Sequence, residues 1–326
     1  MTQTQPHAPI PTKTTPQGVT VRVRRPPTGG DPSAPASGRR TRSLRRAADR
    51  STGGTPATPL VYLTLAVSVL LAAAPLYYMV VMASRPNSDI TSLPPPLTPG
   101  SQLGPNLSRV LANQDVMFGQ AMVNSVLVAG AATVSVVVLS ALAGFAFAKL
   151  RFKGRNALLL IVIGTMMIPV QLGLVPLYML MGKLGLAGTL PSALLPFLVS
   201  GFGVFMMRQY AAQAIPNELI EAARVDGAST TRIFFSVVFP ILRPAAAVLG
   251  LLTFMERWND FLWPYLTLDA DHPTVQVALS RLSGGYYTDQ ALVMAGTLLG
   301  TLPLVVVFIV FGRQIIGGIM QGGVKG

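Results

Sequence analysis

Six blocks of about 20 apolar residues most constrain what this chain can fold into. They lie at about 60–83, 121–148, 157–181, 190–210, 245–266 and 291–313. A helix rises about 1.5 Å per residue and needs roughly 20 residues to cross about 30 Å of hydrocarbon. With 51% hydrophobic and 11% charged residues, the chain also has too little charge for an ordinary soluble domain. We predict an all-α integral membrane protein with six transmembrane helices.

The first 59 residues form a separate region, because Pro, Thr, Gly and Arg dominate them and periodic apolar positions are almost absent. Such a segment cannot bury enough surface to offset the entropy cost of ordering. Ten basic and two acidic residues give it more than half of the chain's net charge of +13. We interpret residues 1–59 as a disordered basic cytoplasmic tail and residues 60–326 as the membrane domain. Three interpretations fit the basic run Gly38–Arg46. It is a cytoplasmic flank of the first span under the positive-inside rule, a segment that binds anionic lipid headgroups, or a twin-arginine export signal. Because the positive charge is concentrated in a segment next to the membrane, we expect the chain to contact membrane lipid and not nucleic acid.

Basic residues in the short links predict the orientation. The link between spans three and four holds only Lys183, whereas the link between spans two and three holds Lys149, Arg151, Lys153 and Arg155. Cytoplasmic links carry an excess of Lys and Arg, so we expect a multi-pass protein with both termini in the cytoplasm. Aromatic rings near the outer ends of spans would then anchor at headgroup level, namely Tyr77, Tyr78, Trp263 and Tyr265.

The link between spans four and five, Ile215–Ala245, predicts a helical hairpin. Gly227 can end a first helix in the left-handed conformation, and Ser229 can cap a second helix that runs to Pro240 and Pro244. The apolar side of the first helix is predicted at Leu219, Ile220, Ala223 and Val225. Small residues around the turn would let another protein approach closely, namely Ala222, Ala223 and Ala228. Two interpretations fit: a docking knob for another protein, or an amphipathic connection on the membrane surface.

Within this link, EAARVDGAST (Glu221–Thr230) followed by VVFP (Val237–Pro240) resembles the cytoplasmic loop signature of permeases of ATP-binding-cassette (ABC) importers. The matched positions are Glu221, Ala222, Ala223, Gly227 and Pro240. Asp226, directly before Gly227, is a further candidate for the same site. Three more stretches resemble the carbohydrate and glycerol-phosphate branch of this family, in particular the smaller subunit of maltose-type permeases. They are MMIPVQLGLVPLYML (Met166–Leu180), RWNDFLWPYL (Arg257–Leu266) and GGVKG (Gly322–Gly326).

The resemblance covers roughly residues 60–326 and implies a permease subunit in a bacterial cell membrane, forming half of a pathway for a sugar, an oligosaccharide or a glycerol-phosphate-like solute. Its implied partners are a second permease in a heterodimer, two cytoplasmic ATPases and an extracellular solute-binding protein. A cytoplasmic coupling helix between spans four and five would sit in a cleft of one ATPase, with Glu221 as a polar contact and Gly227 as the turn.

The sequence contains no G-x-x-x-x-G-K-[ST] phosphate loop. ATP and Mg would therefore be bound by the partner ATPase, and we expect this chain to bind no cofactor or metal and to be no enzyme. Its only histidines are His7 and His272, outside the predicted spans, which removes Ser–His chemistry from the membrane.

Polar residues interrupt the fifth apolar block at Glu256, Arg257, Asn259 and Asp260. Each central charge facing lipid costs about 2.5–3.5 kcal/mol, so these groups should face the bundle, a partner or water. They either line a translocation pathway, or Arg257 and Asp260 pair at i and i+3 and hold the structure together. Glu256 and Asp260 also leave open an ion-coupled secondary transporter, although no convincing internal repeat supports one.

The third block is interrupted by Pro169, Gly173 and Pro176. These residues either break the helix, so that freed carbonyls line a cavity, or only kink it for packing. The lone polar groups Asn124 and Gln171 either hydrogen-bond between helices or contact a ligand.

Overall fold

The computed structural model describes residues 58–284 and 288–323, with side chains up to Gly312. The chain divides into two units, Met1–Leu65 and Ala66–Gly326. One described helix, Pro59–Ala83, runs across this boundary in the sequence, and the other described elements belong to the second unit. The regular elements of the described residues are all helical, and one isolated bridge joins Gly188 to Leu268. The predicted tail lies outside the described residues except for its last two positions.

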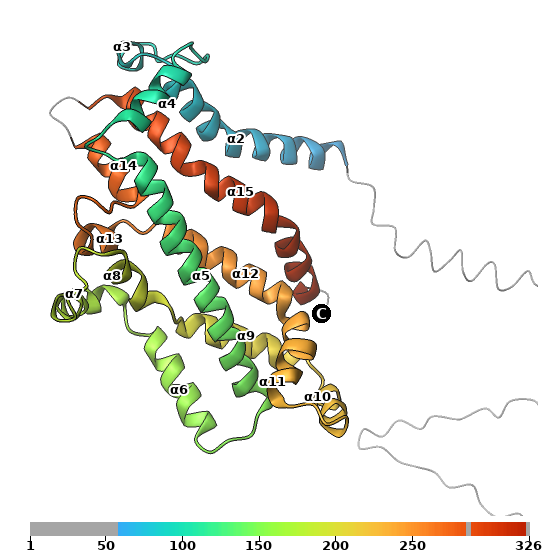
Figure 1. The fold of residues 1–326 in the computed structure, drawn as a ribbon. Helices are drawn as coiled ribbons and strands as arrows, with labels where there is room; N and C mark the ends of the chain where they lie inside the picture. The colour runs from blue at the N-terminus through green and yellow to red at the C-terminus, as the bar shows by residue number, and fades with distance from the viewer. Residues whose placement is uncertain (1–57, 285–287, 324–326) are drawn as a thin grey trace, which may run out of the picture. The chain divides into compact units, whose positions relative to one another are not determined.

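Figure 1 shows the helices in chain order. The first is α2 (Pro59–Ala83), followed by the short helices α3 (Asn87–Ile90) and α4 (Leu103–Ala112). Three more long helices are α5 (Phe118–Lys149), α12 (Phe239–Trp258) and α15 (Gln290–Gly323). Between α5 and α12 lie α6 (Arg155–Met166), η1 (Val170–Gly173), α7 (Leu174–Lys183), α8 (Leu190–Leu194), η2 (Leu195–Phe197), α9 (Gly201–Ala214), α10 (Asn217–Val225), α11 (Thr230–Ile233) and the π-helical turn η3 (Phe234–Val238). Between α12 and α15 lie α13 (Leu262–Thr267) and α14 (Val275–Ser283).

Among the described residues, four continuous helices are long and apolar enough to cross a membrane: Pro59–Ala83, Phe118–Lys149, Thr230–Trp258 and Gln290–Gly312. Two bent pairs pass the same test when each pair is taken together. One pair, Arg155–Met166 with Val170–Lys183, bends by 89°, and the other, Leu190–Phe197 with Gly201–Ala214, bends by 40°. The structure therefore has four to six candidate spans, and the third and fourth predicted spans are not single straight helices.

The sharp bend in the third apolar block has a local cause. Pro169 has no backbone N–H to donate, and its ring disfavours helical geometry at Ile168. The helix closes just before this point, where the N–H of Met167 reaches back to Gly164. The chain then passes through the short helix η1. Of the two alternatives, a broken helix and a packing kink, the structure therefore has the broken helix, bent by 89°.

The sequence predicted a hairpin helix that runs to Pro240 and Pro244, followed by a separate fifth span at 245–266. The structure differs at both the start and the end of that span. One helix runs from Thr230 to Trp258 without stopping at Pro240 or Pro244. A π-helical turn precedes Pro240, and the N–H of Phe239 donates to Phe234, five residues back. This wider turn accommodates the proline, which cannot donate to the helix.

The same helix ends at Trp258 and not at residue 266. Asn259 follows it, and its side-chain amide donates to the carbonyl of Met255 at 2.8 Å. Asn and Asp side chains compete for backbone groups in this way and favour helix ends over helix interiors. The chain then re-enters a short helix, α13.

The core of the bundle is built around α5, which packs against both α9 and α12, while α12 also packs against α15. Glycines allow α5 and α9 to approach closely. A Cβ on Gly144 would lie 2.7 Å from the backbone of Met207, and one on Gly203 would collide with the hydroxyl of Ser140. Small residues at such contacts are the usual means by which membrane helices pack.

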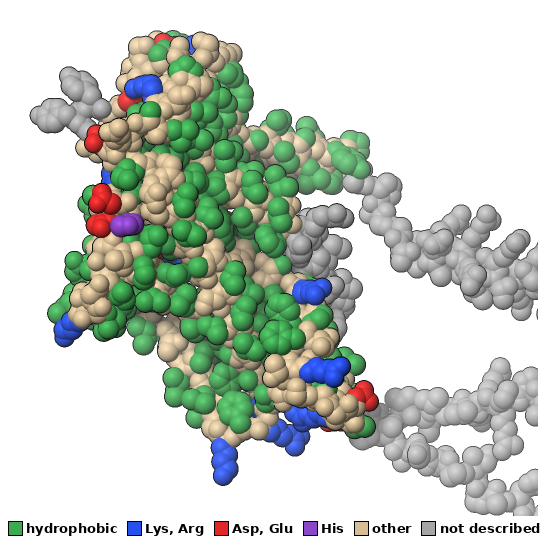
Figure 2. Space-filling view, in the orientation of Figure 1, with side chains coloured by type: hydrophobic (Ala, Val, Ile, Leu, Met, Phe, Trp, Pro, Cys, Tyr) green, Lys and Arg blue, Asp and Glu red, His purple; other side chains and the backbone are tan. Residues whose placement is uncertain are grey.

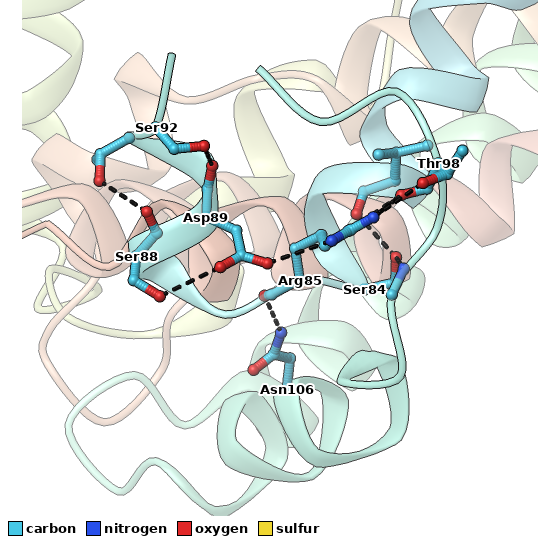
Figure 3. Close-up of polar contacts among 10 residues, drawn as sticks. Ser84, Arg85, Ser88, Asp89, Ser92, Thr98 and Asn106 are labelled. Atoms are coloured by element: carbon cyan, nitrogen blue, oxygen red, sulfur yellow. Dashed lines mark hydrogen bonds and ion pairs between the residues drawn. The ribbon is translucent and has the colours of Figure 1, made fainter. Parts of the chain in front are cut away.

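A polar latch holds the segment that follows α2 (Figure 3). The Arg85 guanidinium donates to the Thr98 carbonyl at 2.9 and 3.0 Å and pairs with Asp89 at 3.2 Å. The amide of Asn106, on α4, donates to the carbonyls of Ala83 and Arg85. These bonds satisfy carbonyls at the end of α2 and fix the proline-rich segment between α3 and α4.

The latch is joined to the start of α15. Arg109 of α4 pairs with Asp289 at 2.6 Å, and Asn87 of α3 accepts a hydrogen bond from the backbone of Gln290 at 2.9 Å. We call this end of the bundle the α3 end, and the end that carries α10 the α10 end (Figure 1).

Candidate functional site

The hairpin predicted between the fourth and fifth apolar blocks exists and is attached to the bundle at two points. At the start of α10, Asn217 accepts a hydrogen bond from Lys149, the last residue of α5, at 3.0 Å. One turn later, Ile220 is buried in an apolar cluster that includes Phe145 of α5, Met207 of α9 and Leu242 of α12. Both points tie α10 to the helices that form the centre of the bundle.

The turn after α10 is fixed by backbone hydrogen bonds. Gly227 has φ of 77°. The N–H of Gly227 donates to Arg224 and that of Ala228 donates to Ala223, both at 3.0 Å. This pair of bonds is the Schellman arrangement that satisfies the last carbonyls of a helix. Ser229 then caps α11, where its hydroxyl accepts from the N–H of Arg232. The hairpin is therefore a defined element with a fixed angle.

The outward surface of α10 carries the matched residues Glu221 and Ala222, and Asp226 and Gly227 lie beside them, all exposed. The predicted apolar side does not form one face. Ile220 and Ala223 pack inward, whereas Leu219 is exposed and Val225 is 88% exposed. The prediction failed because Val225 follows Ile220 by five residues, and at 3.6 residues per turn this spacing places the two side chains on different sides of the helix. The exposed surface thus combines two apolar side chains with acidic groups.

The second polar group lies where α12 ends. Arg257 pairs with Asp260 at 3.1 Å and also contacts Glu256. Its guanidinium carbon lies 4.0 Å from the centre of the Phe197 ring, a cation–π geometry. The arginine side chain is 11% exposed and that of Asp260 is 20% exposed, whereas Asn259 is exposed and its amide donates to the carbonyl of Met255 in its own helix. Only part of the predicted set is therefore brought together.

A cavity of about 260 Å³ adjoins this group. It is lined by Glu256, Arg257 and Asp260 on one part and by Val170, Gln171 and Leu174 of the broken third block on another. The break at Pro169 thus contributes residues to a cavity. Arg257 and Asp260 form an ion pair and also line this cavity. Asn124, by contrast, is buried and donates to the carbonyl of Pro273 at 2.9 Å, which is a structural hydrogen bond.

The two predicted groups of site residues are not close to each other. Pro240, half-buried just after the π-helical turn, belongs with the hairpin, and Glu256–Asp260 lies at or just beyond the far end of the same helix. A helix of 29 residues is about 40 Å long at 1.5 Å per residue. The helix Thr230–Trp258 connects them.

Sequence reasoning missed two features of these sites. Phe197 beside Arg257 could not be found, because the contact needs η2 to pack near the end of α12. The latch around Arg85 was also missed, although a lone arginine directly after an apolar block was a signal. The part of the chain that the structure describes contains no group of three His, Cys, Asp or Glu side chains that could hold a metal ion.

Residues 136–316 match the family described as binding-protein-dependent transport system inner membrane component. Over 265 residues the chain is 35% identical to the lactose transport system permease protein LacG of Rhizobium radiobacter, covering 81% of this chain and 95% of LacG. It is 38% identical over 204 residues to the arabinooligosaccharides transport system permease protein AraQ of Halalkalibacterium halodurans, covering 62% and 73%. It is 33% identical over 267 residues to the sn-glycerol-3-phosphate transport system permease protein UgpE of Yersinia pestis, covering 80% and 95%.

The fold is similar to that of a chain in the crystal structure of a bacterial ABC transporter involved in the import of the acidic polysaccharide alginate. The TM-score is 0.66 at 23% sequence identity, and the match covers 86% of this chain and 100% of that chain. The family match over residues 136–316 and the permease relatives define the class, a membrane component of a transport system. The chain belongs to the binding-protein-dependent transport system inner membrane component family. It is a transport subunit, and a separate ATPase subunit hydrolyses ATP in such systems.

Proposed function

We propose that this chain is a permease subunit that forms half of the translocation pathway of a bacterial ABC importer for a carbohydrate or a glycerol-phosphate-like solute. Relatives named for lactose, arabinooligosaccharides and sn-glycerol-3-phosphate support this class of solute. The observation that carries the proposal is the hairpin of α10 and α11, which presents the family-like Glu221–Gly227 stretch on an exposed surface.

In this proposal each bent helix pair counts as one span, which gives six spans with both termini in the cytoplasm. The basic link before α6 and the hairpin at α10 then share the cytoplasmic side, as the positive-inside bias requires. The partners are a second, different permease, two ATPases and an extracellular solute-binding protein. The α3 end, with its latch, faces that binding protein. ATP and Mg are bound by the ATPases.

We assign α10 the role of coupling helix. Its exposed Leu219 and Val225 would enter an apolar cleft of an ATPase, with Glu221 as a polar contact. The attachments at Asn217 and Ile220 support this role, because a push on α10 is carried to α5 and α12 and not absorbed by a flexible loop. Ala222 and Asp226 lie on the exposed surface, while Ala223 and Pro240 help to set the hairpin on the bundle.

We assign the cavity beside Arg257 to the translocation pathway. A guanidinium can donate to sugar hydroxyls and pairs well with phosphate, which suits both classes of solute. Asp260 and Glu256 supply acceptors on the same wall, and Asn259 lies exposed beside them. Because α12 joins this cavity to the hairpin, one helix would transmit ATPase closure to the solute path.

Uptake by the reconstituted transporter tests the proposal. The chain would be purified with its co-expressed partners, placed in vesicles and supplied with the solute-binding protein and labelled sugars or glycerol phosphate. We expect uptake to require ATP on the α10 side and to continue after ionophores collapse the ion gradients. Uptake that follows an ion gradient without ATP would support the ion-coupled alternative and overturn the importer.

A further inference from the structure

The turn between α5 and α6 carries an uncompensated cluster of positive charge. Four basic residues fall within seven positions: Lys149, Arg151, Lys153 and Arg155. No acidic residue occurs between Asp115 and Glu218, and none of the four forms an ion pair among the described residues. In Figure 2 basic side chains gather at this end of the molecule. The positive-inside bias explains why this turn has many basic residues, but it does not explain how they are arranged in space.

Their arrangement forms a hollow of about 460 Å³. Its lining includes Arg151, Arg155 and Asn156, together with Gly154, whose φ is 81°. Gly154 directly precedes α6, whose start has no side-chain cap. Because the first residues of this 12-residue helix also line the hollow, its positive end meets the hollow. Two guanidiniums, an amide and a helix start around one space are donors suited to a phosphate.

Beyond the hollow, α6 exposes apolar side chains, and two of them, Leu158 and Ile161, share a face at i and i+3. Leu158, Leu160 and Ile161 are 48%, 70% and 62% exposed. Phe152, which lines the hollow, is itself exposed and lies 5.9 Å from the ring of Phe147. A ligand with a phosphate and long apolar chains could use both the hollow and these exposed apolar side chains, whereas free phosphate would use only the hollow.

We propose that the hollow binds the headgroup of an anionic phospholipid, with the acyl chains lying along the exposed side of α6. Arg151 and Arg155 would hold the phosphate, and the amide of Asn156 would donate to it. Basic pockets at the membrane surface bind anionic lipid headgroups in this way. The inference goes beyond the transport function, since it assigns a lipid site on the outer surface of the chain.

Lipid retention by the full chain tests the proposal. The chain would be purified in mild detergent, incubated with equal amounts of phosphatidylglycerol and phosphatidylcholine carrying the same acyl chains, and analysed by native mass spectrometry. We expect selective retention of phosphatidylglycerol, and about tenfold weaker retention after the double change Arg151→Gln and Arg155→Gln. Thermal unfolding would confirm that this variant is folded. If it is not, Arg151→Gln alone carries the test with about threefold weaker retention.

The matched control is Arg224→Gln with Arg232→Gln, which removes two exposed charges from the hairpin at the same end. This control should retain the lipid as the unchanged chain does. Equal losses in both double variants, or no preference for phosphatidylglycerol, would overturn the site. Complete displacement by inorganic phosphate would overturn the lipid and indicate a free phosphate as the ligand.

Discussion

Gly227 shows how one residue can fix the angle of the hairpin. Its φ of 77° lies in the left-handed region, and nothing lies within 4 Å of the place that a Cβ would occupy. A side chain there would cause no collision, so its cost is backbone strain alone. Most L-residues lose about 1–2 kcal/mol in this region, whereas Asn tolerates it better.

We therefore expect Gly227→Ala to lower the free energy of unfolding by about 1 kcal/mol and to reduce solute-stimulated ATP hydrolysis. Gly227→Asn, the control, should retain more of both. Urea unfolding in detergent and ATPase assays of the assembled transporter would measure these effects. Equal losses in the two variants would contradict backbone strain as the cause.

Arg257 and Asp260 form a half-buried ion pair, so removing one partner leaves the other charge poorly compensated. We expect Asp260→Asn and Arg257→Gln each to cost about 1–2 kcal/mol of stability, and the double variant to cost less than their sum. Asp271→Asn, on an exposed loop, should change stability by less than about 0.5 kcal/mol. Additive losses in thermal unfolding would show that the two side chains act independently.

The sequence predicted that ion pair from its i, i+3 spacing, but it could not predict what surrounds the pair. Trp263 was predicted as an anchor in the membrane interface and is instead buried, with its indole N–H donating to the carbonyl of Ser192 at 3.0 Å. That prediction was wrong because Ser192 and Phe197 come from a segment about 70 residues earlier. Such contacts exist only after α8 and η2 pack against α13.

Among the elements, α5 and α9 pack most closely, because Gly144 meets the backbone of α9 directly. Extra atoms cannot be accommodated there by a side-chain rotation. Gly130 lies on the same helix, and nothing lies within 4 Å of its Cβ position. The two glycines therefore offer the same substitution in opposite environments.

We expect Gly144→Ala to destabilise the chain by about 1–3 kcal/mol, since overpacked contacts cost that much. Gly130→Ala should be neutral or stabilising by up to about 1 kcal/mol, because Ala favours helix over Gly. Thermal unfolding followed by circular dichroism would separate them. A loss in Gly130→Ala as large as that in Gly144→Ala would contradict the packing described.

The length of each apolar block predicted where helices lie, because about 20 apolar residues satisfy their backbone only as a helix in lipid. The form of those helices was less predictable. The break near Pro169 could be expected from proline, but its angle of 89° depends on packing. The continuation of one helix through Pro240 depends on a π-helical turn, which the sequence does not reveal by periodicity.

Across the whole molecule, the helix Thr230–Trp258 connects the hairpin at the α10 end with the cavity beside Arg257. Coupling through α10 requires that an ATPase docks on the exposed surface of α10. The chain contains no cysteine. Single cysteines can therefore report its neighbours in the assembled transporter without background labelling.

The most direct measurement compares two exposed positions at opposite ends. Val225→Cys and Leu93→Cys replace side chains that are 88% and 93% exposed, and a maleimide–succinimide reagent would join each thiol to nearby lysines of the partners. We expect Val225→Cys to cross-link to the ATPase and Leu93→Cys to give no ATPase adduct. An ATPase adduct from Leu93→Cys, or none from Val225→Cys in an active transporter, would contradict coupling through α10.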